Sequence, residues 1–217
     1  MKKLLIFLLL FPTLTFAEES TLNCHCFQNR TYDHKDRAAA DPYFLASSQS
    51  SFVSAIYGVE KRALVMAKMS GANNDYLWIL YDLAKRTGQS SKQIAAIHKQ
   101  EKNWTKTFEK LGQSPQSLGQ DYCDSGNEPQ QLANLIVDDH LIGFFGATKS
   151  DIQNWRNKGL NRKEIILGNI LDGTPVDLYN QVNSQMKSWG QLLDEQGLKT
   201  GKDVTRKLKA QLSKSSS

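Results

Sequence analysis

The chain has 217 residues, of which 40% are hydrophobic, so it can form one large domain or two small ones. Its formal net charge of +5 resides in residues 199–217, because the preceding residues sum to zero. The body therefore lacks the basic excess of a nucleic-acid-binding protein. Beyond residue 17 no apolar run approaches the ~20 residues that span a bilayer, which argues against a membrane-spanning protein.

Residues 1–17 have the pattern of a cleaved secretory signal peptide. Two lysines precede an uninterrupted apolar run over residues 4–11, and Thr15 and Ala17 place small side chains before the predicted cleavage point. The run is much shorter than the ~20 residues of a membrane anchor, so cleavage is favoured over retention. We therefore expect a periplasmic or secreted protein.

Residues 18–40 lack hydrophobic periodicity, and we expect them to form an extended arm that carries Cys24 and Cys26. The third cysteine is Cys123. In an oxidising compartment these thiols predict a disulfide between Cys123 and either Cys24 or Cys26. Closing a loop of about a hundred residues stabilises a fold by up to ~4–5 kcal/mol in the chain-entropy model.

Two other interpretations of the cysteines stay open. Cys24, His25, Cys26 and Cys123 form an allowed zinc ligand set, although His25 points away from its neighbours on an extended strand. Alternatively, the Cys-x-Cys pair does redox work, because its very small ring makes a strained, oxidising disulfide. We favour the structural disulfide and expect no resident cofactor.

Comparison of the sequence with itself indicates a tandem duplication. At an offset of 88, the identical residues are Gly58, Lys61, Gly71, Asn73 and Leu83, which match Gly146, Lys149, Gly159, Asn161 and Leu171. At an offset of 85, they are Gly88, Gln100, Lys102, Trp104 and Gly112, which match Gly173, Gln185, Lys187, Trp189 and Gly197. The sequence therefore predicts two repeats, 41–112 and 128–198, joined by a linker over residues 113–127.

Each repeat has the pattern of five short helices. In the first repeat we expect Asp41 to cap the first helix and Pro42 to occupy its first turn. Glycines end the helices, because glycine adopts the left-handed conformation that follows a helix at little cost. In the second repeat, Glu128–Pro129, Asn161 and Thr174–Pro175 are expected to begin helices.

The aromatic and acidic residues of the repeats are better explained by structural roles than by a catalytic or metal site. Trp104 and Trp189 occupy matching positions at helical spacing from other apolar residues, so we expect both in the core. Trp78 and Trp155 have no counterpart and are expected to mark a differentiated surface. The run at 138–140, Asp-Asp-His, suggests an acid/base or metal site, but we expect a solvated acidic patch.

No stretch alternates apolar and polar residues, so we predict an all-α protein. One repeat alone has few large apolar residues, and we expect the two to pack into one bundle-like domain. Residues 199–217 form a basic tail that begins as a helix, because Val204, Leu208 and Leu212 lie four apart. We expect this tail to be separable from the fold.

The repeated order of Gly, Leu or Ile, Leu, Gly, Ile or Val, Trp and a final Leu-Gly pair resembles a unit in uncharacterised exported helical-repeat proteins of Gram-negative bacteria. The opening CHCF, followed by Arg30 and the DPYF of residues 41–44, is similar to the arm before that unit. The resemblance covers most of the chain after residue 17. It implies no activity and therefore assigns no functional residue.

These patterns predict a non-enzymatic interaction or scaffold module of the bacterial cell envelope. The sequence has no clustered catalytic signature, and repeat architectures commonly present a binding face. The expected partner is an envelope protein or an anionic envelope surface contacted by the basic tail. A helix-turn-helix pattern over residues 88–111 is set aside because of the export signal. The alternative is a periplasmic metal-binding or thiol-redox protein built on Cys24, His25, Cys26 and Cys123.

Overall fold

The computed structural model describes residues 32–114 and 128–215, which form eleven helices and no strand, so the all-α prediction is confirmed. The helices are α1 (Arg37–Tyr57), α2 (Lys61–Met69), α3 (Asn74–Thr87), α4 (Ser91–Glu101), α5 (Trp104–Lys110), α8 (Pro129–Phe145), α9 (Lys149–Asn157), α10 (Arg162–Ile170), α11 (Pro175–Asn183), α12 (Trp189–Glu195) and α13 (Gly201–Ser215). The predicted signal peptide, most of the predicted arm and most of the linker lie outside the described residues.

Local sequence sets most helix boundaries. The side chain of Asn73 accepts the amide N–H of Tyr76 at the start of α3, and Ser90 forms a reciprocal capping box with Gln93 at the start of α4. Gly58 and Gly146 end α1 and α8 with the same left-handed φ of 67°. The expected starts at Glu128–Pro129, Asn161 and Thr174–Pro175 are all observed.

The predicted start of the first helix is wrong. Helix α1 begins at Arg37, inside the segment expected to be an arm, and the side chain of Asp36 caps it by accepting the amide N–H groups of Ala38 and Ala39. Pro42 lies within this helix. Asp41 lies inside α1, where it pairs with Arg37 four residues earlier and accepts the N–H of Gly190 on α12.

The helices after α1 recur in the same order after α8. The starts of α2 and α9, and of α3 and α10, differ by 88 residues, whereas the starts of α5 and α12 differ by 85. The starts of α4 and α11 differ by 84, one fewer than the sequence alignment gave. The described residues thus contain two series of five helices with matching order and closely matching spacing.

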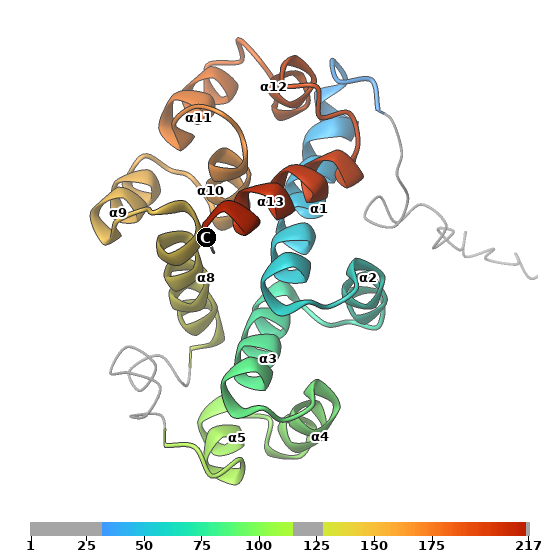
Figure 1. Cartoon of the computed structure of the whole chain (residues 1–217), viewed down its shortest axis with the longest axis vertical. Coiled ribbons are helices and arrows are strands. Elements are labelled where there is room, and N and C mark those ends of the chain that lie inside the picture. Colours follow the sequence, from blue (N-terminus) through green and yellow to red (C-terminus); the bar gives the residue numbers. More distant parts are fainter. Residues whose placement is uncertain (1–31, 115–127, 216–217) are drawn as a thin grey trace, which may run out of the picture.

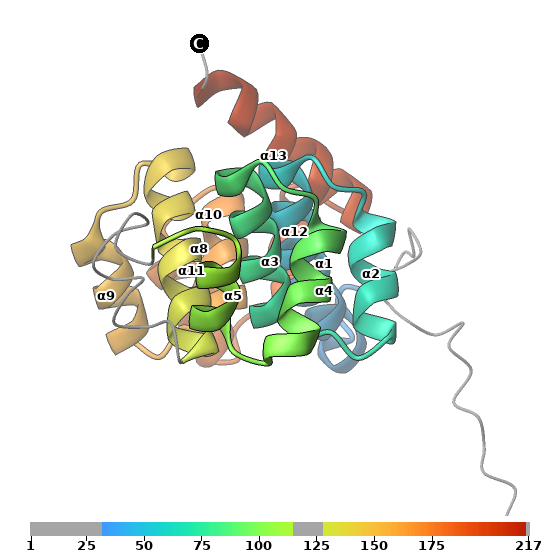
Figure 2. The same cartoon turned by 90° about the horizontal axis from the view of Figure 1, so that it is seen from below.

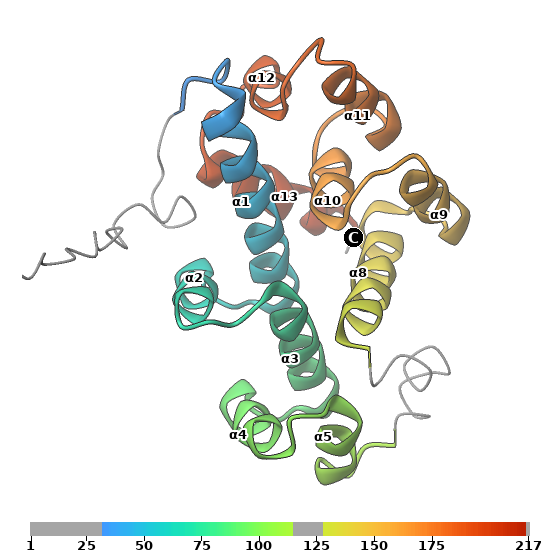
Figure 3. The ribbon, with the colours of Figure 1, turned by 180° about the vertical axis from the view of Figure 1, so that it is seen from behind.

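The two series pack against each other through α1, α3, α8 and α10. Helix α1 packs against α10, and α3 packs against α8, while α2, α4 and α5 lie outside α1 and α3 (Figures 1 and 3). Helices α9 and α11 lie outside α8 and α10, and α12 packs against α1. The buried apolar side chains of both series belong to one hydrophobic core.

All four tryptophans are buried. Trp104 and Trp189 are 3% and 1% exposed, as expected from their positions. The expectation that Trp78 and Trp155 mark a surface is wrong. Trp78 points from α3 toward the ring of Phe52 on α1, with centroids 5.8 Å apart, so the lack of a matching tryptophan reflects different core packing.

The basic C-terminal segment is an integral part of the fold, which corrects the prediction of a separable tail. Val204 and Leu208 are 0% exposed, and α13 packs along α1 (Figure 2). The backbone N–H of Gly201 donates to the Tyr43 hydroxyl over 3.1 Å. A Cβ at Gly201 would lie 2.2 Å from the Ser47 hydroxyl, so only glycine permits this close crossing.

Within the described residues, no helix is both long enough and apolar enough to cross a membrane.

Candidate functional site

A polar groove of about 590 Å³ lies between the two helix series, and we call it the central groove. It is lined by α1, the start of α3, α8 and the segment that joins α9 to α10. Six of its twelve lining residues carry side-chain amides, namely Gln49, Asn73, Asn74, Gln130, Asn134 and Asn161. A groove with this lining suits a ligand rich in hydrogen-bonding groups.

Ion pairs hold two guanidinium groups at this groove. Arg162 donates to Asp75 over 2.5 Å and to Asn134 over 2.8 Å, which links α10 to α3 and α8. Arg156 forms a bidentate pair with Asp138, with N–O distances of 2.6 and 2.7 Å. Burial raises the pKa of the Asp138 carboxyl despite the compensating charge of Arg156.

Gln49 is the unusual member of the central groove. It lies on α1 and is only 2% exposed, yet its side chain lines the groove. Among the described residues, no side chain or backbone group hydrogen-bonds to its amide. Neither atom of this amide is both buried and without a partner, so the amide is accessible from the groove that it lines.

A second polar cluster joins α1, α3 and α8, and we call it the Asp82 cluster. The Tyr57 hydroxyl lies 2.8 Å from Nε2 of His140 and 3.3 Å from Oδ1 of Asp82, and Arg86 donates to Asp82 over 2.7 Å. Burial would raise the pKa of the Asp82 carboxyl, but interactions with His140 and Arg86 outweigh it and hold that pKa below its usual value.

The Asp-Asp-His run does not act as one site, nor is it a fully solvated acidic patch. His140 faces Asp82, Asp138 pairs with Arg156, and the half-exposed Asp139 lies 3.8 Å from Arg86. Sequence reasoning missed Asp82, because a lone aspartate within an amphipathic helix gives no local signal of a partner on α8. No group of three or more metal-ligating side chains occurs among the described residues.

A basic groove of about 430 Å³ separates α2 from α13. Its lining includes Lys61, Lys202, Arg206 and Lys209 and contains no carboxylate. Two serines of α1 hold the Lys61 side chain in place, because its ammonium group donates to the Ser47 and Ser51 hydroxyls over 2.6 and 3.1 Å. Arg206 forms an ion pair with Asp203 over 2.6 Å on the same helix, so part of this positive charge is neutralised. The remaining concentration of basic side chains makes this groove a candidate surface for anionic partners.

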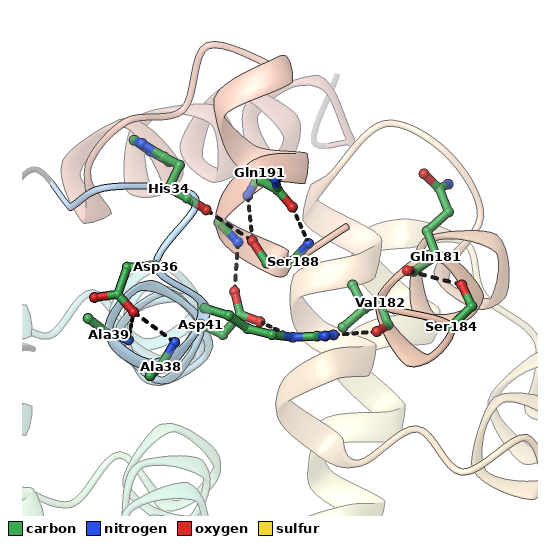
Figure 4. A network of polar contacts seen from close by, with 12 residues as sticks. His34, Asp36, Ala38, Ala39, Asp41, Gln181, Val182, Ser184, Ser188 and Gln191 are labelled. Atoms are coloured by element: carbon green, nitrogen blue, oxygen red, sulfur yellow. Dashed lines mark hydrogen bonds and ion pairs between the residues drawn. The ribbon is translucent and has the colours of Figure 1, made fainter. Parts of the chain in front are cut away.

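The start of α1 is tied to α12 by a separate polar network (Figure 4). The Asp41 carboxylate accepts the backbone N–H of Gly190 over 2.8 Å and pairs with Arg37, whose guanidinium also donates to the Val182 carbonyl. Burial raises the pKa of the Asp41 carboxyl, although the N–H groups of α12 and Arg37 oppose the shift. This network is structural, since Asp41 accepts an N–H in the first turn of α12 in addition to the local capping box of Ser188 and Gln191.

Cys24, His25, Cys26 and Cys123 lie outside the described residues. The disulfide between Cys123 and Cys24 or Cys26, and the alternative zinc set, therefore stay predictions. Comparison with protein-family models, curated proteins and solved structures finds no match to this chain.

Proposed function

We propose that this chain is an exported, non-enzymatic interaction module of the bacterial cell envelope that binds anionic lipid surfaces through its basic groove. The observation that carries the proposal is the convergence of Lys61, Lys202, Arg206 and Lys209 on one groove without an acidic side chain in its lining. Such a concentration of cations attracts phosphate headgroups by roughly 1 kcal/mol for each basic residue near the surface.

Exposed methionines on α2 support a lipid surface as the partner. Met66 and Met69 are 49% and 45% exposed, and with Arg62 they recur at a spacing that places them on one side of the helix. Flexible apolar side chains beside basic residues are typical of helices that rest in the interfacial layer of a membrane.

A tandem duplication is the second part of the proposal. It is supported by the matching order of the two helix series and by their reciprocal packing. If α8 corresponds to α1 and α10 to α3, then the contact of α1 with α10 and that of α3 with α8 are equivalent. The two repeats would then form one domain by mutual insertion, as neither buries its apolar face alone.

Co-sedimentation with lipid vesicles tests the binding proposal. The protein should bind vesicles that contain phosphatidylglycerol and should bind neutral phosphatidylcholine vesicles only weakly. Because salt screens the charges, rising salt concentration should release it from the phosphatidylglycerol vesicles. Replacing Lys202, Arg206 and Lys209 together with glutamine should weaken binding by about 3 kcal/mol, or roughly 100-fold.

The matched control removes the same charge elsewhere. Lys92, Lys106 and Lys110 are exposed on α4 and α5, and their replacement with glutamine should leave most of the affinity intact. Equal losses in both triple variants would show that only net charge matters and would refute a specific groove. Binding that is insensitive to salt would also refute the electrostatic proposal.

A further inference from the structure

We propose that the basic groove holds one molecule of a single-chain anionic lipid, with the phosphate among the lysines and the acyl chain in an adjoining apolar groove. This assignment rests on the proposed function, since both need the cations of the basic groove. It adds a defined occupant and a one-to-one stoichiometry. Two observations carry it, namely the continuity of two grooves along α13 and the difference in charge and polarity between them.

The adjoining groove, which we call the lateral groove, has a volume of about 610 Å³. Lys61, Thr205 and Lys209 line both grooves, so the two grooves meet along α13. Their lining follows α13 from Lys202 to Leu212, which is roughly 15 Å at the rise per residue of an α-helix. An elongated ligand can therefore lie along α13 and occupy both grooves.

Apart from the three shared residues, the lateral groove is lined mainly by small and apolar groups. Ala55, Val59 and Leu212 are half-buried and pack against the hydrophobic core. The rest of the lining is one serine, one glycine and the exposed Glu60, which is the one carboxylate there. The apolar side chains suit an acyl chain, whereas Glu60 repels an anionic group from this end.

The basic groove can accept a phosphate without breaking an ion pair of the fold. Lys202 and Lys209 are exposed, and no ion pair or hydrogen bond joins their ammonium groups to another described residue. Arg206 is different, because it already pairs with Asp203. Two ammonium groups without such a partner thus line a groove that contains no carboxylate, and a phosphate headgroup is complementary to them.

The size of the grooves favours a lipid with one acyl chain. Volumes of about 430 and 610 Å³ both lie within the ~300–1,000 Å³ range of small-molecule sites. The apolar part of the lateral groove consists of three half-buried side chains, which give contact area for one acyl chain. A lysophospholipid with a phosphodiester headgroup has the required shape and charge.

Isothermal titration calorimetry with lauroyl lysophosphatidylglycerol, below its critical micelle concentration, tests the proposal. We expect one-to-one binding that is at least about tenfold tighter than binding of the octanoyl lipid, because a longer chain buries more apolar surface. Glycerophosphoglycerol, which lacks the acyl chain, and lauroyl lysophosphatidylcholine, whose headgroup is zwitterionic, should each bind at least about tenfold more weakly. Equal binding of either control, or no one-to-one binding of the lauroyl lipid, would overturn the proposal.

A matched pair of variants locates the acyl chain. Val59→Gln places a polar amide in the lateral groove and should weaken binding of the lauroyl lipid about tenfold. Val176→Gln makes the same change at another half-buried valine, on α11, which lines neither groove, and should leave the affinity unchanged. If Val59→Gln does not fold, Leu212→Gln makes the same test from α13. Unchanged affinity in the folded lateral-groove variant would overturn the placement of the chain.

Vesicle binding separates this site from the proposed function. Attraction to a vesicle depends on the cations, so Val59→Gln should co-sediment with phosphatidylglycerol vesicles as the native protein does. Vesicle binding without one-to-one binding of the lysolipid would refute the lipid site and leave the proposed function standing. Lysolipid binding without vesicle binding would support the site and refute binding to lipid surfaces.

Discussion

The two helix series differ most in the middle of their first helices. In α1, residues 47–51 are five consecutive polar residues, SSQSS, and all five are buried, whereas α8 has Leu, Ile and Val at 135–137. The serines of α1 bond to Lys61, Lys68 and Thr205, while Gln49 faces the central groove. The buried polar side chains of α1 thus contact α2, α13 and the central groove, whereas residues 135–137 of α8 are apolar and are followed by two aspartates.

The Asp82 cluster shows the same asymmetry. Asp82 of α3 corresponds at an offset of 88 to Ile170, and His140 of α8 corresponds to Phe52, both fully apolar and buried. A polar contact between α3 and α8 therefore occurs at positions whose counterparts at this offset, on α10 and α1, are apolar.

Weakening the packing of α13 should lower the stability of the fold more than the other changes below. Helix α13 packs on the part of α1 that carries the buried serines. Leu208→Ala should lower the free energy of unfolding by about 3 kcal/mol, since its side chain is 0% exposed. Urea denaturation followed by circular dichroism measures this change. Lys209→Ala, on the exposed side of the same helix, should shift it by under ~0.5 kcal/mol. If the native chain, Leu208→Ala and Lys209→Ala are equally stable, the C-terminal segment is separable from the fold after all.

Replacing Asp82 and His140 with the apolar residues found at the corresponding positions, Ile and Phe, should have the next largest effect on stability. Asp82→Ile alone should cost about 2–3 kcal/mol, because it leaves the buried parts of His140 and Arg86 without their acceptor. Adding His140→Phe should recover part of that loss. A double-mutant cycle by urea denaturation measures the coupling, and strictly additive losses would contradict a shared network.

Substitutions at Asp41 should change the stability of the fold least among these three sites. Asp41→Ala removes the acceptor for the N–H of Gly190 and should cost about 1 kcal/mol, whereas Asp41→Asn keeps an acceptor and should cost less. Comparison of the two melting temperatures at pH 7 checks this order.

The pH dependence of the same variants gives a second test. The folded state raises the pKa of Asp41, so the folded chain binds this proton more tightly than the unfolded chain does. Protonation of Asp41 therefore contributes stability that is full below the ordinary value of 3.8 and lost as pH rises through the folded-state pKa. The stability of Asp41→Asn relative to the native chain should therefore improve as pH rises from 3 to 6, by urea denaturation at each pH. An opposite trend would mean that the folded state lowers that pKa.

The sequence by itself determined the helical class and nearly all helix boundaries, because a boundary depends on a capping side chain or glycine within a few residues. Asn73, Ser90 and Gly58 act locally, and their roles were predictable. The matching tryptophans Trp104 and Trp189 were also predictable as core residues from helical spacing alone.

Only the tertiary structure decided which distant groups meet. Asp41 accepts the N–H of Gly190, 149 residues away, α13 packs on the first helix of the fold, and Asp82 contacts His140 on another helix. No local sequence pattern pointed to Gln49, because the groove that it lines forms only when the two helix series pack together. A short segment fixes its own backbone hydrogen bonds, but the partner of a buried polar side chain is set by packing, which no local pattern records.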